Sequence, residues 1–195
     1  MKNLLTLFVL FLGLGMLNSQ EKKELTKEET VTYLNKKLDE VQEQWIVENN
    51  GSKQFIKWIN VKNQDSELSI SDNRENRITN DHTCGDWEKE QSYDFNPAQI
   101  SEITDSTLKT EQPLGYVQIK LIAKTAKSRM VFKVIYTRDD GSNRTCNYWK
   151  NDTDNRDFSE YVFIPYLKTD PSNFNKIKKA FEHLKKLSAA SDDPF

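Results

Sequence analysis

Residues 116–136 of this 195-residue chain read YVQIKLIAKTAKSRMVFKVIY, and the alternation of apolar and polar side chains along them decides the fold. The alternation runs through residues 116–122 and again through residues 130–136. A period of two places alternate side chains on one face of a β-strand. The stretch therefore predicts two strands, each with one buried face. These faces are expected to hold Val117, Ile119, Leu121, Met130, Phe132, Val134 and Tyr136.

Further runs rich in β-branched and aromatic residues predict strands at 54–62, 67–71, 92–95, 143–149 and 158–164. Residues 139–142, Asp-Asp-Gly-Ser, predict a hairpin turn because Asp-Gly tolerates positive φ. Pro165 has no amide hydrogen, which limits the last strand to a sheet edge or a strand end. Asn96-Pro97 predicts a break, and Ile100 with Ile103 predicts a short helical turn or a bent strand. The polar stretches 72–82 and 151–157 are expected to be loops.

Two helices are expected to flank the strands. Thr26 and Glu29 form a capping box at the start of a helix over about 26–44. A second helix is expected over about 171–188, with Asp170 as its cap and Pro171 in its first turn. Apolar side chains recur at helical spacing in both. These stripes are Val31, Leu34, Leu38 and Val41, and Phe174, Ile177, Ala180, Phe181, Leu184 and Leu187.

The order of helix, about seven strands over 54–165 and helix predicts an α+β fold. The strands would form an antiparallel sheet or a small barrel. Residues 20–195 are expected to form one domain, because their length suits one core and no linker divides them.

Residues 1–19 predict an export signal, since Lys2 precedes an apolar run over 4–17. The run is short for a membrane anchor, and no later run approaches that length. The protein is therefore expected in the periplasm or outside the cell. In that setting Cys84 and Cys146 are expected to form a disulfide bond, the alternatives being two free thiols or a cysteine nucleophile.

The charge balance argues against nucleic acid as a partner. The chain holds 28 Lys and Arg against 30 Asp and Glu, a net charge of −2. Binding to phosphate backbones requires a clustered basic excess. The predicted partner is therefore a protein or a glycan.

The candidates for catalysis or metal binding each have a plainer interpretation. His82 and Cys84 could form a nucleophilic pair, but a disulfide would remove the thiolate. His183 has no partner ligands at helical spacing and is interpreted as solvated. Residues 152–157 alternate oxygen-bearing side chains as calcium loops do, but they lack the central glycine and place Arg156 at a ligand position. We therefore predict no catalytic, cofactor-binding or metal-binding residue.

The four tryptophans could be core residues or sugar-stacking platforms. Core or partial burial is the favoured interpretation, because these rings bury a large area. They are Trp45, Trp58, Trp87 and Trp149.

Residues 93–103, YDFNPAQISEI, and residues 180–187, AFEHLKKL, resemble pleckstrin-homology-like domains over about 54–187. The resemblance implies a barrel with one end closed by the last helix. The family's basic loop is replaced by Asn63-Gln64-Asp65-Ser66, so lipid headgroup binding is not implied. The chain as a whole is similar to small exported proteins of the Bacteroidetes.

The leading hypothesis is an exported binding module without catalytic activity, in which a loop or an exposed strand edge contacts the partner. The alternative is a small exported hydrolase whose carboxylates converge only in the fold. A third hypothesis is a domain stabilised by calcium at residues 152–157.

Overall fold

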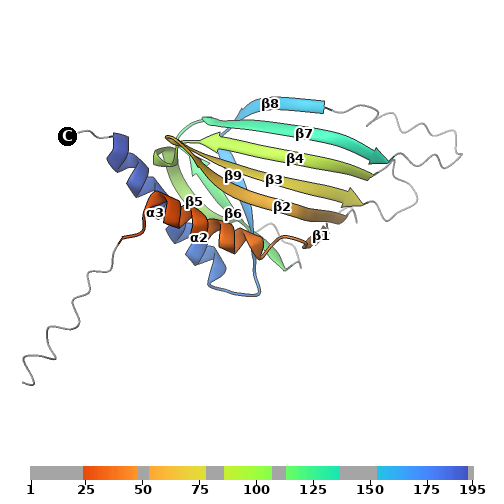
Figure 1. Cartoon of the computed structure of the whole chain (residues 1–195), viewed down its shortest axis with the longest axis horizontal. Helices are drawn as coiled ribbons and strands as arrows, with labels where there is room; N and C mark the ends of the chain where they lie inside the picture. The colour runs from red at the N-terminus through yellow and green to blue at the C-terminus, as the bar shows by residue number, and fades with distance from the viewer. Residues whose placement is uncertain (1–23, 48–52, 78–85, 107–112, 137–152, 193–195) are drawn as a thin grey trace, which may run out of the picture.

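The computed structural model describes residues 24–47, 53–77, 86–106, 113–136 and 153–192. These residues form an α+β fold, as expected (Figure 1). The helices are α2 (Lys27–Asp39) and α3 (Asn173–Asp192), with a 3-10 turn η1 (Pro97–Gln99). The strands are β1 (Trp45–Val47), β2 (Lys53–Gln64), β3 (Glu67–Arg77), β4 (Asp86–Phe95), β5 (Ile100–Ser106), β6 (Leu114–Leu121), β7 (Ala126–Tyr136), β8 (Thr153–Ser159) and β9 (Tyr161–Leu167).

The strands form two antiparallel sheets, and the chain passes between them three times. One sheet has the order β1-β2-β3-β4-β7-β8 and the other has the order β5-β6-β9. The crossings lie between β4 and β5, between β6 and β7, and between β8 and β9. Near these crossings the Leu121 amide donates to the Glu160 carbonyl and the Ile122 amide to the Gln99 carbonyl, both at 2.9 Å.

The described residues thus contain nine strands rather than about seven, and neither the seven-strand count nor a closed barrel is confirmed. The extra strand residues come from polar segments. Residues 72–77, predicted to be a loop, are the second half of β3. Of the two alternatives for residues 100–103, the bent strand is the one observed: they lie in β5, whose register shifts between Ile100 and Glu102, and the 3-10 turn η1 lies at the Asn-Pro break before it. The predicted turn at 139–142 and strand at 143–149 lie outside the described residues.

Helix α2 begins as predicted and ends earlier. The Glu29 amide donates to Thr26 Oγ1 at 3.1 Å, and the Thr26 amide donates to Glu29 Oε2 at 2.8 Å. The helix was expected to reach Gln44 but ends at Asp39. The reason is that the next residues pair with β2: the Glu43 amide donates to the Ile56 carbonyl, and the Ile56 amide donates to the Gln44 carbonyl.

The core lies between the sheets and the two helices, which pack against each other along one side of the molecule (Figure 1). Both helical stripes are buried as predicted, apart from Phe174 and Leu187, which are half-buried. Pro165 lies in β9, an edge strand of the smaller sheet, as its missing amide hydrogen requires.

The two edges of the six-stranded sheet differ in how far other described elements cover them. The β2 side is protected, because β1 covers its start and the Asn35 side chain of α2 pairs with both backbone groups of Val61, at 2.7 and 2.8 Å. At the opposite edge, β8 pairs with β7, and within the described residues no element covers its other side. Unpaired edge groups are available for another strand.

Candidate functional site

Strands β4, β7 and β8 bring charged side chains and one exposed aromatic ring into register on one face of the sheet. In one cross-strand row, Asp94 pairs with Lys127, and Lys127 pairs with Phe158. The next row on this face joins Ser92, Arg129 and Arg156. A hollow of about 620 Å³ lies here, and we call it the β8-side groove. It is lined by Ser92, Asp94, Lys127, Ser128, Arg129, Arg156, Asp157 and Phe158.

Ion pairs hold the charged groups of this face in place. Arg129 donates from Nε and Nη2 to the two carboxylate oxygens of Asp154, each at 3.0 Å. Arg156 lies 3.5 Å from the same carboxylate. The hydrogen bond from Arg129 lowers the pKa of Asp154. Lys127 reaches both oxygens of Glu67, at 3.0 and 3.1 Å.

Phe158 is the apolar element of the groove, and its side chain is 58% exposed. A large exposed apolar ring flanked by guanidinium and carboxylate groups provides a flat contact surface with hydrogen-bonding groups at its rim. The arrangement can bind a ligand that has both an apolar face and polar edges.

The segment 152–157, expected to be a loop, is a strand from Thr153 onward, so the loop prediction is wrong for those residues. Asp152 lies outside the described residues. The Asp154 carboxylate accepts hydrogen bonds from Arg129 on both oxygens, and this pairing would compete with a bound metal ion. Within the described ranges, no group of three or more His, Cys, Asp or Glu residues is arranged to hold a metal ion.

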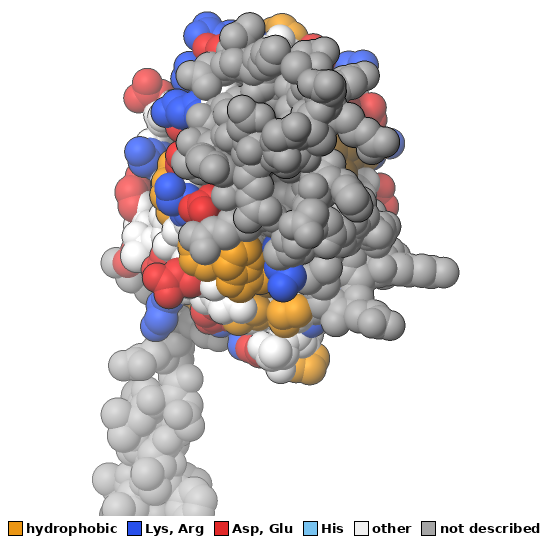
Figure 2. All heavy atoms as spheres, turned by 90° about the vertical axis from the view of Figure 1, so that its right-hand side faces the viewer, with side chains coloured by type: hydrophobic (Ala, Val, Ile, Leu, Met, Phe, Trp, Pro, Cys, Tyr) orange, Lys and Arg blue, Asp and Glu red, His pale blue; other side chains and the backbone are white. Residues whose placement is uncertain are grey.

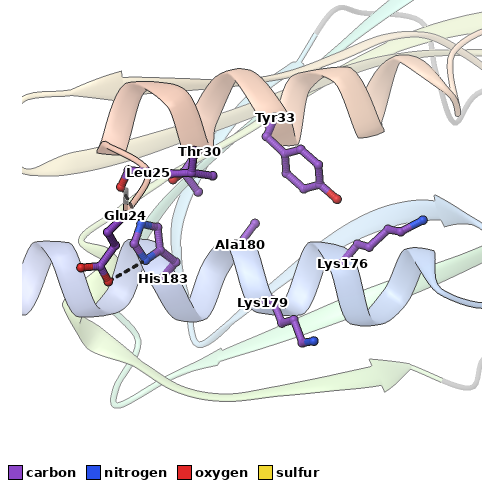
Figure 3. A pocket seen from close by; sticks show the side chains of 8 residues that line it. All are labelled: Glu24, Leu25, Thr30, Tyr33, Lys176, Lys179, Ala180 and His183. Atoms are coloured by element: carbon purple, nitrogen blue, oxygen red, sulfur yellow. Dashed lines mark hydrogen bonds and ion pairs between the residues drawn. The ribbon is translucent and has the colours of Figure 1, made fainter. Parts of the chain in front are cut away.

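A second hollow, the α2–α3 groove, has a volume of about 540 Å³ (Figure 3). It is lined by Glu24, Leu25, Thr30, Tyr33, Lys176, Lys179, Ala180 and His183. Its walls come from both helices and from the segment that leads into α2. The groove has a single imidazole and a single carboxylate among these lining residues, so they offer no pair of acidic groups for hydrolysis.

His183 was interpreted as solvated, but the segment before α2 covers it. His183 Nε2 lies 2.7 Å from the Leu25 carbonyl oxygen, and since a carbonyl only accepts, Nε2 carries the hydrogen. Its Nδ1 lies 3.7 Å from Glu24 (Figure 3). The Glu24 carboxylate also accepts from Lys186 at 2.7 Å, which lowers the pKa of Glu24. The histidine therefore fixes the chain to α3.

A buried ion pair lies on β3, in the segment expected to be a loop. Arg74 donates to both oxygens of Asp72, each at 3.0 Å, and both side chains are almost fully buried. Burial alone would lower the pKa of Arg74, but the Asp72 carboxylate and the Tyr116 hydroxyl raise it above its ordinary value. Each charge stabilises the other, so the pair is structural rather than a binding site.

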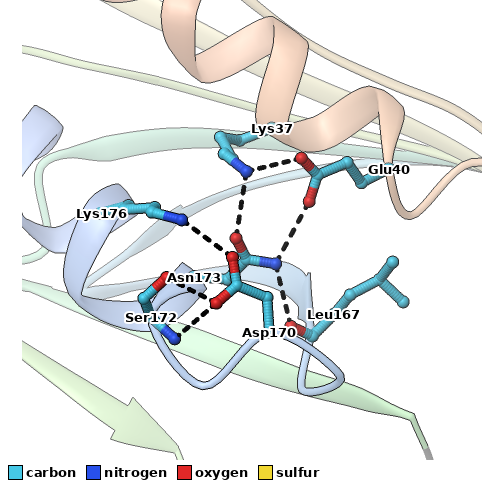
Figure 4. A network of polar contacts seen from close by, with 7 residues as sticks. All are labelled: Lys37, Glu40, Leu167, Asp170, Ser172, Asn173 and Lys176. Carbon is cyan, nitrogen blue, oxygen red and sulfur yellow. Dashed lines mark hydrogen bonds and ion pairs between the residues drawn. The ribbon is translucent and has the colours of Figure 1, made fainter.

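A polar network joins the end of α2 to the start of α3 (Figure 4). The buried Asn173 accepts from Lys37 and donates to Glu40 and to the Leu167 carbonyl. Asp170, the predicted cap, accepts from Lys176 and from the hydroxyl and amide of Ser172, which lowers the pKa of Asp170. The helix begins at Asn173, so Pro171 lies in the turn before it rather than in its first turn.

The remaining sequence candidates divide between described and undescribed segments. His82, Cys84, Cys146 and Trp149 lie outside the described residues. Trp58 and Trp87 are partly buried as predicted, and Trp87 packs edge-on against Phe132.

Trp45 packs on Phe55 with ring centroids 5.0 Å apart and is 39% exposed, so it is the most exposed tryptophan of the described residues. Figure 2 shows the end of the molecule at the right of Figure 1, where hydrophobic side chains form a compact group between charged ones. Apolar contact area is therefore also exposed at this end.

Phe158 and its neighbours were not predicted as a site. The sequence predicted one strand over 158–164, which is wrong: β8 ends at Ser159, and β9 begins at Tyr161 in the other sheet. The cross-strand rows depend on pairing between segments more than 60 residues apart, from Ser92 to Arg156. In the sequence, the only indication of this site was Phe158 directly after the charged residues of 154–157.

Comparison with protein-family models, curated proteins and solved structures finds no match to this chain. Neither helix of the described residues has the length and apolar character needed to span a membrane.

Proposed function

We propose that the protein is an exported binding module without catalytic activity, and that it binds a glycan in the β8-side groove. The observation that carries this proposal is the exposed Phe158 ring, set beside guanidinium and carboxylate groups in a hollow of about 620 Å³. The export signal at residues 1–19 and a location in the periplasm or outside the cell are parts of the same proposal.

The chemistry of the groove suits a sugar. The C–H face of a sugar ring can pack on an aromatic ring, and each sugar hydroxyl both donates and accepts hydrogen bonds. Arg156 and Lys127 supply donors, and Asp94 supplies an acceptor, within the same lining. A purely anionic ligand would meet the Asp94 carboxylate, which favours a neutral or weakly charged glycan.

The test is binding of the mature chain, residues 20–195, to defined immobilised oligosaccharides. We expect Phe158→Ala to weaken binding by about tenfold or more, because the sugar ring loses its aromatic support. Phe163→Ala is the matched control, because Phe163 is also exposed, at 38%, but lies on β9. Absence of glycan binding by the unaltered chain, or equal loss in both variants, would contradict the proposal.

The alternative of a small hydrolase rests on Asp94 and Asp157, which both line this groove, although the alternation along β8 places Asp157 on the opposite face from Phe158. A hydrolase would release shorter sugars from the bound glycan and would lose turnover in Asp94→Asn or Asp157→Asn. A binding module leaves the glycan intact. Chromatography of the glycan after prolonged incubation separates these two functions.

The likeness to pleckstrin-homology-like domains is also a proposal about architecture. It is supported by α3, which packs against η1 and the smaller sheet as the closing helix of that family would. An experimental structure in which the sheets remain open at β8 would reject it.

A further inference from the structure

Strand β8 has the properties of a strand that receives another strand. Among the described elements it pairs only with β7, so no described strand pairs with the backbone groups on its second side. Residues 154–158 are exposed on both faces of the sheet. An uncovered edge of this kind is a template for strand addition.

The backbone orientation along this edge follows from one hydrogen bond. The Phe158 amide donates to Oδ1 of the neighbouring Asp157 at 2.7 Å, so it faces the open side rather than β7. Backbone groups of successive residues point to opposite sides of a strand. The amides and carbonyls of Asp154 and Arg156 therefore also face the open side.

We propose that β8 pairs in antiparallel fashion with β8 of a second copy of this chain, with Asp154 opposite Arg156 of the second copy. A two-fold axis then passes by Asn155, and each copy exchanges backbone hydrogen bonds through residues 154 and 156. The register is chosen by charge. Moving the axis to Asp154 or Arg156 would place like charges opposite each other, whereas this register pairs opposite charges twice.

The Arg156 side chain is available for this contact, since it is 73% exposed and reaches Asp154 of its own chain only at 3.5 Å. The self-complementary charges favour a second copy over an unrelated strand. A short edge buries less than the roughly 1,200 Å² of a stable complex, so the dimer depends on concentration. The dimer and the proposed glycan groove share Arg156, which lines that groove and also enters the charge pairs, whereas Phe158 stays outside these pairs.

The first test is sedimentation of the mature chain over a wide concentration range. The unaltered chain forms a dimer, and Asp154→Arg or Arg156→Asp weakens association by about tenfold or more, because either change places like charges opposite each other. An equal mixture of the two variants associates again, since the two arginines of one variant then lie opposite the two aspartates of the other. Lys62→Glu, on the distant β2, leaves association unchanged. A monomer throughout, or a mixture that does not associate, overturns the proposal.

A second variant tests the register without changing these charges. The axis at Asn155 brings its two copies together as a non-hydrogen-bonded pair with Cα atoms about 4.5 Å apart. Asn155→Cys therefore forms an intermolecular disulfide in mild oxidant, whereas Lys62→Cys and the unaltered chain do not. Failure of Asn155→Cys to cross-link, or cross-linking of Lys62→Cys to the same extent, rejects the pairing.

Discussion

Tyr166 lies so close to Gly115, its cross-strand partner, that a β-carbon on Gly115 would lie 2.6 Å from both Cε1 and Oη of the tyrosine. Both residues are buried, and the Tyr166 hydroxyl donates to Asp105 at 2.8 Å. The glycine therefore makes room for a ring that joins all three strands of the smaller sheet.

Gly115→Ala is expected to lower the free energy of unfolding by about 1–3 kcal/mol, because the new methyl group displaces a tethered ring. Urea unfolding measures the loss. Repeating the substitution in a Tyr166→Leu background provides the control, since the smaller side chain removes the clash. An equal loss in both backgrounds would show that the Tyr166 ring is not the cause.

Tyr166 should make the protein sensitive to alkali. Burial first, and then the Asp105 carboxylate, raise the pKa of Tyr166 to about 12 from the ordinary 10. The folded state thus keeps the proton where the unfolded chain loses it. The stabilisation is complete below pH 10 and falls as the pH rises toward 12. Tyr166→Phe should flatten this decline in urea unfolding curves, and an unchanged slope would contradict the assignment.

Asp72→Asn is expected to cost about 3–5 kcal/mol, because it leaves the buried Arg74 without its counter-charge. The double variant Asp72→Leu with Arg74→Met should cost less, as it removes both charges together. Denaturant unfolding of the three proteins measures this order. If the double variant is less stable than Asp72→Asn, the ion pair is not what makes the single change costly.

Asn173→Ala should destabilise the protein by about 1–3 kcal/mol, since it removes one hydrogen bond each from Lys37, Glu40 and the Leu167 carbonyl. Asn175→Ala is the matched control, because Asn175 is exposed on the same helix. Thermal unfolding compares the two. Similar melting temperatures for both variants would contradict a role for the network in joining the helices.

The Cys84–Cys146 disulfide stays a prediction, and the strand arrangement favours it. Strands β4 and β8 both pair antiparallel with β7, so they begin at the same end of the sheet. Cys84 and Cys146 precede these two strand starts in the sequence. We expect faster gel mobility without reductant, and a loss of about 4 kcal/mol on reduction. Two titratable thiols in the unreduced protein would refute the bond.

The helices and the most regular strands could be predicted because their signals are local. The capping box at Thr26 and the stripes that include Leu34 and Phe181 each depend on residues within a few turns of one another. The polar half of β3 could not be predicted, because Asp72 and Arg74 neutralise each other inside the protein. Nor could β8, since an edge strand exposed on both faces lacks the alternation of a half-buried strand.

The candidate site was harder to predict than the fold. The strand predicted over 158–164 corresponds mostly to β9, and nothing in the sequence placed the Phe158 ring beside Lys127 and Asp94. His183 was interpreted as solvated because its own helix shows only lysines nearby, whereas the chain that covers it comes from residues 24 and 25. In both cases the partners are distant in sequence, and no periodicity records such contacts.

The sequence by itself determined two amphipathic helices around a set of alternating strands, because side-chain period and capping act over a few residues. Only the tertiary structure decided that the strands form two sheets, that α2 protects the β2 edge while β8 stays open among the described elements, and that Phe158 lies among paired charges. These features depend on which strands pair and in which register. That choice is made by the total burial and hydrogen bonding of the whole chain rather than by any one segment.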